Sequence, residues 1–207
     1  VNGQLFASHL LCSARGGCTG SLLVLDVSNP STPFEISSDD VMWEYEQPQY
    51  TSGVDTSDIA VMDSYAYIAD GDDLQVIDIS NPYDPTLVGR NGGYVHLGQG
   101  RHYRKSARSV ALVAEYAYVI NGYDILRALD ISRPSNPTDV GSYRTAQPIR
   151  DMIAVGDYVY ITDRTQLYIV DVSDPMNPQN VGAYTVIAGS VNEVVVFGEH
   201  AYANAWT

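Results

Sequence analysis

The chain has 207 residues, of which 45% are hydrophobic, so it is long enough for one domain with a substantial core or for several small repeated units. Acidic residues outnumber basic ones by 25 to 11. The resulting net charge of −14 argues against nucleic-acid binding, because such a surface repels phosphate backbones. No apolar run reaches the length of about 18 residues that a membrane span needs, and residues 1–7 lack the features of a signal peptide.

The chain begins with a strand-like segment, which continues into a short loop between the two cysteines. Residues 1–8 match the second strand of the repeated unit described below. Five residues separate Cys12 from Cys18, and two of them are glycines, so the loop can close easily into a disulfide. A zinc site would need more ligands than His9, the candidate nearby. We expect a structural disulfide between Cys12 and Cys18, and with it an oxidising compartment.

A motif of the form Asp-[Val/Ile]-Ser-x-Pro-x-x-Pro occurs four times, and its aspartates are separated by 52, 52 and 41 residues. The copies are residues 26–33, 78–85, 130–137 and 171–178. Such self-similarity indicates a repeat architecture. The prolines cannot donate to a sheet and should end a strand, and each aspartate can accept a hydrogen bond from the backbone N–H two residues later. This interpretation gives a structural role to Asp26, Asp78, Asp130 and Asp171.

The last motif copy shows the repeated unit most clearly, because its step is the shortest. Its segments are rich in β-branched and aromatic residues and are separated by turn residues. The expected strands are residues 149–155, 158–162, 167–172 and 180–184. Four short antiparallel strands in about forty residues make one blade of a β-propeller. Third strands of such blades are buried on both faces, so Ile77 and Ile169 are expected in the core.

The two preceding copies fit the same order of strands. The expected strands of the second copy are residues 59–61, 65–69, 74–78 and 86–89. Those of the third copy are residues 109–113, 116–120, 125–129 and 139–143.

The third strand and its motif resemble the LVIVD-repeat family of β-propellers, found mainly in secreted and surface-anchored prokaryotic proteins. Residues 74–82 and 167–175, each preceded by a Tyr-x-Tyr pattern, carry the resemblance, which covers nearly the whole chain. It implies a propeller and an extracellular setting, and it supplies no catalytic residue. The third copy departs from the family, since Arg127 and Arg133 stand at positions that are usually uncharged.

We expect one all-β propeller region over residues 1–207, built of four-stranded antiparallel blades and forming a segment of a larger propeller. Its expected parts are a partial blade at 1–56, blades at 57–105, 106–147 and 148–187, and a partial blade at 188–207. Residues 197–204 match the second strand of a unit, as residues 1–8 do, so a ring of four blades would have one such strand too many. The alternative is a four-bladed ring with one frayed strand.

Loops between the strands are the expected location of a binding site, because loops on a rigid scaffold carry function. Asp70, Asp72 and Asp73 share one turn and could place oxygen ligands on calcium, although Gly-Asp clusters are also ordinary turn chemistry. The insertion at residues 90–108 is the most basic part of this acidic chain. Its candidate binding residues are Arg101, His102, Arg104, Lys105 and Arg108. This insertion is either a docking loop for an acidic protein or another copy, or a solvated loop.

Motifs for catalysis are absent from the sequence, which has no Gly-x-Ser-x-Gly, no His-Glu-x-x-His and no phosphate-binding glycine loop. We assign no catalytic residue and expect no cofactor other than calcium. Our first hypothesis is a non-catalytic extracellular or cell-surface module for protein interaction or self-assembly. The alternative is a propeller-type polysaccharide hydrolase or lyase, or a carbohydrate-binding module. The sixteen tyrosines would suit sugar stacking, but most recur at repeated strand positions and indicate blade packing.

Overall fold

The computed structural model consists of β-strands and connecting turns throughout the part of the chain that it describes. It describes residues 4–12, 18–39, 58–69, 74–92, 94–96, 102–104, 107–121, 124–186 and 190–206. The expected all-β fold is therefore confirmed. Within these residues no helix is long and apolar enough to cross a membrane.

Five sheets follow one another along the chain, and a short hairpin lies between the second and the third. The first sheet contains β1 (Gln4–Cys12), β2 (Cys18–Asp26) and β3 (Phe34–Asp39). The second contains β4 (Asp58–Met62), β5 (Tyr65–Ala69), β6 (Leu74–Asp78) and β7 (Thr86–Asn91). The hairpin consists of β8 (Tyr94–His96) and β9 (His102–Arg104).

The remaining three sheets complete the order. The third contains β10 (Val110–Val113), β11 (Tyr116–Asn121), β12 (Ile125–Asp130) and β13 (Thr138–Arg144). The fourth contains β14 (Asp151–Val155), β15 (Tyr158–Thr162), β16 (Gln166–Asp171) and β17 (Gln179–Thr185). The fifth contains β18 (Ser190–Phe197) and β19 (His200–Trp206).

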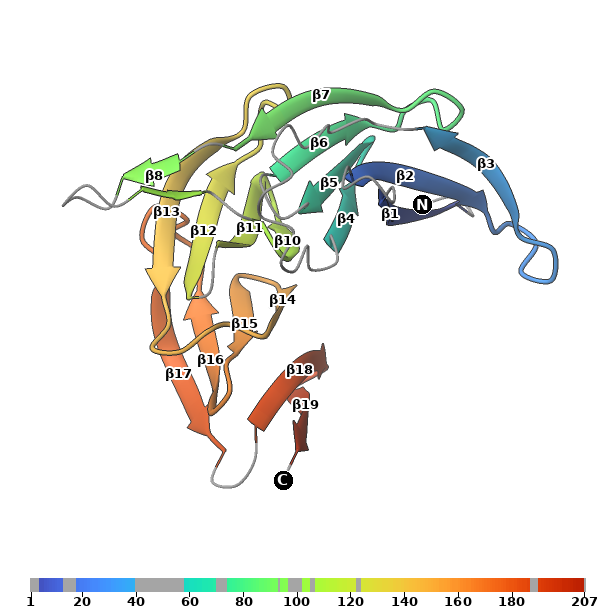
Figure 1. Ribbon diagram of the computed structural model, residues 1–207. Coiled ribbons are helices and arrows are strands. Elements are labelled where there is room, and N and C mark those ends of the chain that lie inside the picture. Colours follow the sequence, from blue (N-terminus) through green and yellow to red (C-terminus); the bar gives the residue numbers. More distant parts are fainter. Residues whose placement is uncertain are drawn as a thin grey trace.

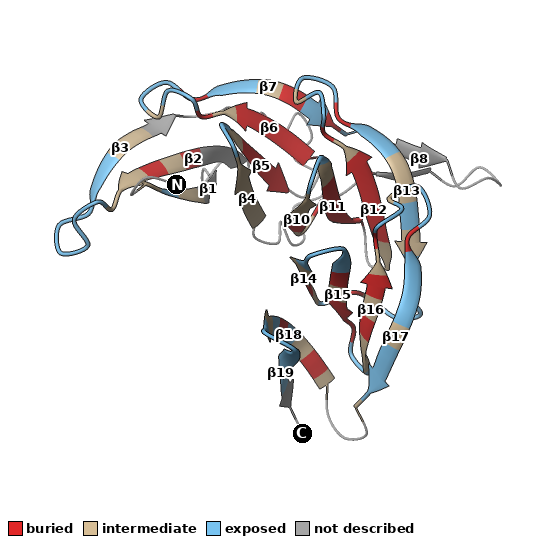
Figure 2. Ribbon diagram, turned by 180° about the vertical axis from the view of Figure 1, so that it is seen from behind, coloured by how far each residue is buried: buried red, intermediate tan, exposed pale blue. Residues whose placement is uncertain are grey.

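The sheets stand side by side around an open arc, as propeller blades do (Figure 1). The first strands β4, β10, β14 and β18 line the inside of the arc, and β3, β7, β13 and β17 follow its outside. Neighbouring strands are antiparallel in every sheet. Figure 2 shows that buried residues concentrate in the middle strands, whereas the outer strands are largely exposed. The four-stranded blades expected from the repeat are thus present.

The strand register repeats from sheet to sheet with the motif. Each motif aspartate pairs with the first residue of the preceding strand, which is Gln4, Tyr65, Tyr116 or Tyr158. The pairing of the third and fourth strands shifts at the same place in all four copies, one to two residues before that aspartate. A bulge of this kind bends a strand and increases its twist. Positions that match in this register can therefore be compared directly between sheets.

Each motif turn is closed by two local hydrogen bonds. The Oδ1 atom of the aspartate accepts from the backbone N–H of the serine two residues later, at 2.8 or 2.9 Å in all four copies. The first proline then takes the second position of a β-turn. A backbone hydrogen bond closes this turn; in the second copy the Asp84 N–H donates to the Asn81 carbonyl at 3.1 Å. The structural role predicted for the motif aspartates is confirmed.

The core lies in the interfaces between neighbouring sheets, which we call seams. The first seam lies between the first and second sheets, the second between the second and third, and the third between the third and fourth. The first seam packs Leu22 and Val24 against the second sheet. The second and third seams contain Tyr67 and Tyr118, respectively, both buried, which agrees with a packing role for the repeated tyrosines. Apolar burial between sheets is the main stabilising term of such an arrangement.

The two isoleucines expected in the core differ in burial. Ile77 is buried in the first seam, as expected. Ile169 is only half-buried, so that expectation is wrong for this residue. The matching residues Val24, Val76 and Ala128 face the next sheet along the chain and are fully buried. Ile169 faces the fifth sheet, which has two described strands in place of four and leaves this side chain partly uncovered.

Candidate functional site

The basic insertion, which the sequence suggests as a docking loop, is described only in part. Arg101 and Lys105 lie outside the described residues. His102 and Arg104 belong to β9, and their side chains also lie outside the described part. Arg108 is half-buried, and its backbone N–H donates to a carbonyl of β11 at 3.1 Å. A docking role for this insertion stays a prediction.

The calcium and disulfide predictions fall largely outside the described residues as well. Asp70, Asp72 and Asp73 are not among them, and no three His, Cys, Asp or Glu side chains gather as a metal site in the part that is described. The backbones of Cys12 and Cys18 are described and lie directly opposite each other in the pairing of β1 with β2. Opposed residues in antiparallel strands have Cα atoms about 4.5–5.5 Å apart, a separation that a disulfide can bridge.

Two carboxylates at the inside of the arc bind the backbone of the next sheet. The Oδ2 atom of Asp58, the first residue of β4, accepts from the Ser109 hydroxyl at 2.7 Å and from the Val110 N–H at 3.0 Å. The Oδ2 atom of Asp151, the first residue of β14, accepts from the Val194 N–H at 2.9 Å. Each of these bonds ties the first strand of one sheet to the first strand of a neighbour. Neither residue could be predicted from the sequence, because single aspartates that begin strands carry no local signal.

The electrostatic setting of Asp151 disfavours its ionised form. Burial raises the pKa of this carboxyl most, and the charges of Glu193 and Asp58 raise it further, against hydrogen bonds from Val194 and Met152 that lower it. The charges that act on Asp151 thus come from two other sheets, since Asp58 begins β4 and Glu193 lies in β18. A raised carboxyl pKa next to other acids is a feature that acid–base catalysis also uses.

A third carboxylate, Asp163, binds the turn between β15 and β16. It is fully buried, and its Oδ1 atom accepts from the backbone N–H groups of Thr165 at 2.6 Å and Gln166 at 2.7 Å. Its Oδ2 atom accepts from the Tyr168 hydroxyl at 2.9 Å. Burial and this hydrogen bond raise the pKa of Tyr168 to about 12, so the phenol stays protonated and keeps donating. The arrangement is structural, since both carboxylate oxygens of Asp163 accept hydrogen bonds from the adjoining turn and strand of the same sheet.

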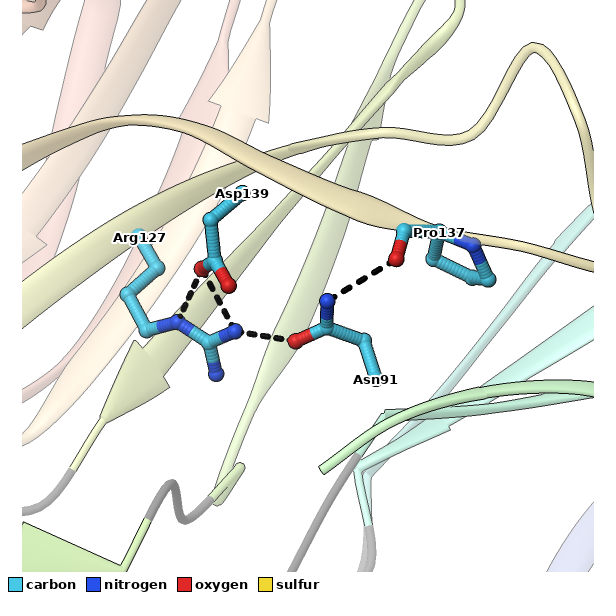
Figure 3. Close-up of polar contacts among 4 residues, drawn as sticks. All are labelled: Asn91, Arg127, Pro137 and Asp139. Atoms are coloured by element: carbon cyan, nitrogen blue, oxygen red, sulfur yellow. Dashed lines mark hydrogen bonds and ion pairs between the residues drawn. The ribbon is translucent and has the colours of Figure 1, made fainter. Parts of the chain in front are cut away.

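The second seam contains a charged network centred on Arg127 (Figure 3). The Arg127 side chain is buried in β12, and its Nε atom donates to Asp139 Oδ1 at 2.6 Å. Its Nη2 atom donates to Asn91 Oδ1 at the end of β7, and Asn91 Nδ2 donates to the Pro137 carbonyl at 2.9 Å. The residue that departs from the family pattern therefore links the second sheet to the third.

A close backbone contact recurs at the outside of the second and third seams. A Cβ atom added to Gly89 in β7 would lie 2.0 Å from the Pro134 carbonyl oxygen of the next sheet. One added to Gly141 in β13 would lie 2.1 Å from the carbonyl oxygen of Pro175. Both prolines are the first proline of a motif copy, so each glycine admits the motif turn of the following sheet. The glycines are required there because the two backbones approach too closely for any side chain.

The same position in the first and fourth sheets completes the comparison. Ser37 in β3 takes it in the first seam, where its hydroxyl donates to the Pro82 carbonyl at 2.9 Å. Gly182 takes it in β17, where the three atoms nearest to an added Cβ all belong to Ile169, at 3.6 to 3.9 Å. Gly182 therefore has the same free space beside it that a motif turn fills at Gly89 and Gly141, but no motif turn of the described residues lies there.

Other residues of β17 are uncovered in the same way. Val140 and Tyr143 of β13 are half-buried in the third seam, and the Tyr143 ring meets Tyr168 of the next sheet edge-on, with ring centroids 6.5 Å apart. Their counterparts in β17 are Val181, which is 58% exposed, and Tyr184, which is 65% exposed. We call Leu167, Ile169, Val181, Gly182 and Tyr184 the open face of the fourth sheet.

Repeated four-stranded sheets joined by seams around an arc define a repeat protein of the β-propeller class. The chain belongs to the LVIVD repeat family, whose model matches residues 18–41, 53–91, 105–145 and 149–186, more than half of its length. The resemblance seen in the motif is thereby confirmed. No curated protein sequence matches the chain.

A solved structure supports the fold independently of the sequence motif. The crystal structure of the computationally designed Ika4 protein is similar, with a TM-score of 0.55 over 75% of this chain and 88% of that one. Sequence identity is 10%, so the similarity concerns the fold alone.

Proposed function

We propose that this chain is a non-catalytic module for protein interaction and assembly, acting outside the cell or at the cell surface. The open face of the fourth sheet carries this proposal, because its apolar residues match those that bind a neighbouring sheet in the third seam. An exposed apolar surface of this kind is typical of interaction sites. Three carboxylates support the same interpretation, since Asp58, Asp151 and Asp163 bind the protein's own backbone.

The extracellular setting is proposed on two grounds. The family resemblance implies it, and the opposed Cys12 and Cys18 suit a disulfide, which persists in oxidising compartments. Alkylation of the native protein under denaturing, non-reducing conditions tests this part. We expect neither cysteine to react before reduction and both to react after it. Free thiols in freshly isolated protein would count against the setting.

Cross-linking mass spectrometry on the protein in its native envelope tests the interaction role. We expect cross-links from the fourth and fifth sheets to a protein, whether another copy or a different chain. If cross-links connect only residues within one copy, the proposed interaction role is wrong.

The alternative is a polysaccharide hydrolase or lyase, and the raised pKa of the Asp151 carboxyl beside the charges of Glu193 and Asp58 favours it. A panel of acidic and neutral polysaccharides, assayed for new reducing ends, separates the two functions. The proposed module releases none. Release that disappears in Asp151→Asn, while the variant keeps its fold, would establish the enzyme instead.

Calcium at Asp70, Asp72 and Asp73 remains a separate proposal, which rests on their residue types and spacing. Chelator should lower the melting temperature, and Asp72→Ala should abolish that response. An unchanged melting temperature would remove calcium from the account.

A further inference from the structure

One position in the third strand differs in chemistry from sheet to sheet, although its neighbours do not. Four, two and one residues before the motif aspartate, all four sheets have apolar residues. Three residues before it, the second, third and fourth sheets have Gln75, Arg127 and Tyr168. The same place in the repeated unit is thus an amide, a charged group or an aromatic ring.

All three of these side chains are buried, and each faces the seam before its own sheet. Residues directly opposite each other in an antiparallel pair share one face of the sheet. The residues opposite these three, in the second strand, all belong to the apolar cluster of the preceding seam; they are Ile68, Val119 and Ile161. The variable position therefore lies where two sheets meet.

The side chain that meets the variable position also differs between seams. In the second seam Arg127 donates through Nη2 to Asn91 Oδ1 (Figure 3). In the third seam the Tyr168 ring meets the Tyr143 ring edge-on, with centroids 6.5 Å apart. Asn91 and Tyr143 take the same place in the register, opposite the leucine four residues before the motif aspartate. Each of these two seams therefore has a pair of its own at one matching place.

The first seam has a third combination of residues at this place. Asp39 lies opposite Leu22, which is the leucine four residues before the aspartate in the first sheet, and Gln75 follows in the second sheet. The side chain of Asp39 lies outside the described residues. By residue type, the three seams combine Asp with Gln, Asn with Arg, and Tyr with Tyr.

Stability alone does not explain a buried arginine in the second seam. Its Nη1 atom has no hydrogen-bond partner among the described residues, and apolar replacements of buried ion pairs are often neutral or stabilising. Buried polar pairs can instead restrict which surfaces associate, because a wrong partner leaves a polar group without its hydrogen bond. Repeated units of similar sequence need such a restriction, since misassembly is a characteristic failure of repeat proteins.

We propose that these pairs determine which sheets pack together, so that each sheet accepts its own neighbour and rejects the others. If the second sheet met the fourth, Asn91 would face Tyr168. If the third sheet met the third sheet of another copy, Tyr143 would face Arg127. The other contacts recur in both seams, namely the apolar clusters and the close approach of a glycine to a motif proline, and would accept either neighbour.

Moving the third-seam pair into the second seam tests whether the pair acts as a unit. Asn91→Tyr alone removes an acceptor of the buried Arg127 and the donor to the Pro137 carbonyl, so the unfolding equilibrium constant should rise about tenfold. Adding Arg127→Tyr should recover most of that loss. Asn121 can then accept from the new hydroxyl, because it stands where Asp163 binds Tyr168 in the fourth sheet.

Urea unfolding measures these constants, and Arg90→Tyr is the matched control. It adds the same ring to the same strand at an exposed residue next to Asn91. Its unfolding constant should change less than about threefold. A double variant that is no more stable than Asn91→Tyr would show that positions 91 and 127 do not act as a pair.

Refolding separates the choice of neighbour from stability. The double variant has the same pair in the second and third seams, so its sheets can combine in more than one order. Diluted from urea at rising protein concentration, wild type and Arg90→Tyr should regain their starting sedimentation profiles. The double variant should leave at least about twofold more material in larger species, in which sheets of different copies are combined.

The reverse exchange provides the same measurement should the new rings not fit the second seam. Tyr143→Asn with Tyr168→Arg moves the second-seam pair into the third, where Asp163 can supply the counter-charge. It should be more stable than Tyr168→Arg alone and should also refold with more large species. The proposal is overturned if neither exchange recovers stability, if both exchanged chains refold as faithfully as wild type, or if neither folds, because a matched pair must work in either seam.

Discussion

The motif aspartates have a local role, which is why their role could be predicted at all. A side chain that binds the backbone two residues away depends only on neighbouring sequence. Hydrogen bonds from the serine two residues later lower the pKa of Asp26, Asp78, Asp130 and Asp171. The serine hydroxyl contributes most at three of them, and the backbone N–H contributes most at Asp78.

These lowered pKa values predict how stability depends on acid. Because the folded pKa lies below the unfolded value of about 3.9, the contribution is complete above that pH and is lost as pH falls through the folded pKa. Replacing all four by asparagine keeps the Oδ1 acceptor and removes the charge. We expect the variant to melt below the wild type at pH 7 and the difference to shrink below about pH 4. Melting temperatures from neutral to acidic pH measure it; a constant difference would contradict it.

Ala114 is a second residue whose conformation has a measurable effect. It has a φ of 48° in the two-residue turn between β10 and β11, and glycines take the same place at Gly156 and Gly198 with φ of 57° and 58°. A residue with a Cβ is strained in this left-handed conformation, whereas glycine is not. Ala114→Gly should therefore raise the free energy of unfolding by about 0.5–1 kcal/mol.

Urea unfolding checks this effect, and Gly156→Ala serves as the mirror-image control. That substitution should lower the stability by a similar amount, because an added Cβ at Gly156 has no atom within 4 Å and the cost comes from the backbone alone. Equal stability of both variants and wild type would show that the turns relax without strain.

At the scale of the strands, the sequence predicts what lies within a sheet better than what lies between sheets. Strand segments such as 158–162 and 167–172 were found within a residue of their expected bounds, because alternation and turn residues are local signals. The hairpin β8–β9 within the basic insertion was not predicted, since it carries no motif copy. The bonds of Asp58, Asp151 and Arg127 join residues 12 to 52 positions apart. No periodicity in the sequence indicates such pairs.

The Arg127 network should be sensitive to which partner is removed. Asp139→Ala leaves a buried guanidinium without its counter-charge, and we expect a loss of about 1–3 kcal/mol. Arg127→Met should cost less or even stabilise, because Arg127 Nη1 is already buried without a hydrogen-bond partner among the described residues. Combining the two should recover most of the loss caused by Asp139→Ala.

Urea unfolding of the single and double variants measures this coupling. The exposed ion pair of Arg144 with Asp124, at 2.7 Å, provides the control, and Arg144→Met should change stability by less than about 0.5 kcal/mol. A larger loss for Arg127→Met than for Asp139→Ala would contradict this, because it would mean that the guanidinium hydrogen bonds stabilise the seam more than the unpaired charge destabilises it.

The close backbone contact at the outside of the seams predicts different stability changes for alanine at two matching glycines. Gly141→Ala forces a Cβ to within 2.1 Å of the Pro175 carbonyl, so the third seam must open or distort. We expect a loss of about 1–3 kcal/mol, as for other overpacked sites. Gly182→Ala meets only the Ile169 side chain and should change the stability of the monomer by less than about 0.5 kcal/mol. Equal losses at both positions in dilute urea titrations would contradict the contact.

For the whole molecule, stability is expected to vary along the arc, because each sheet is held mainly by its neighbours. The second and third sheets have a seam on both sides. The fourth sheet has one complete seam, and β17 is exposed at all but one of its seven residues. Local opening should therefore be easiest at β17 and in the fifth sheet.

Hydrogen exchange followed by mass spectrometry tests this gradient at low protein concentration, where copies are separate. We expect the slowest exchange in β5, β6, β11 and β12, intermediate exchange in β15 and β16, and the fastest in β17 and β19. Uniform exchange across all sheets would show that the arc opens as a single cooperative unit, with burial in the seams failing to set local stability.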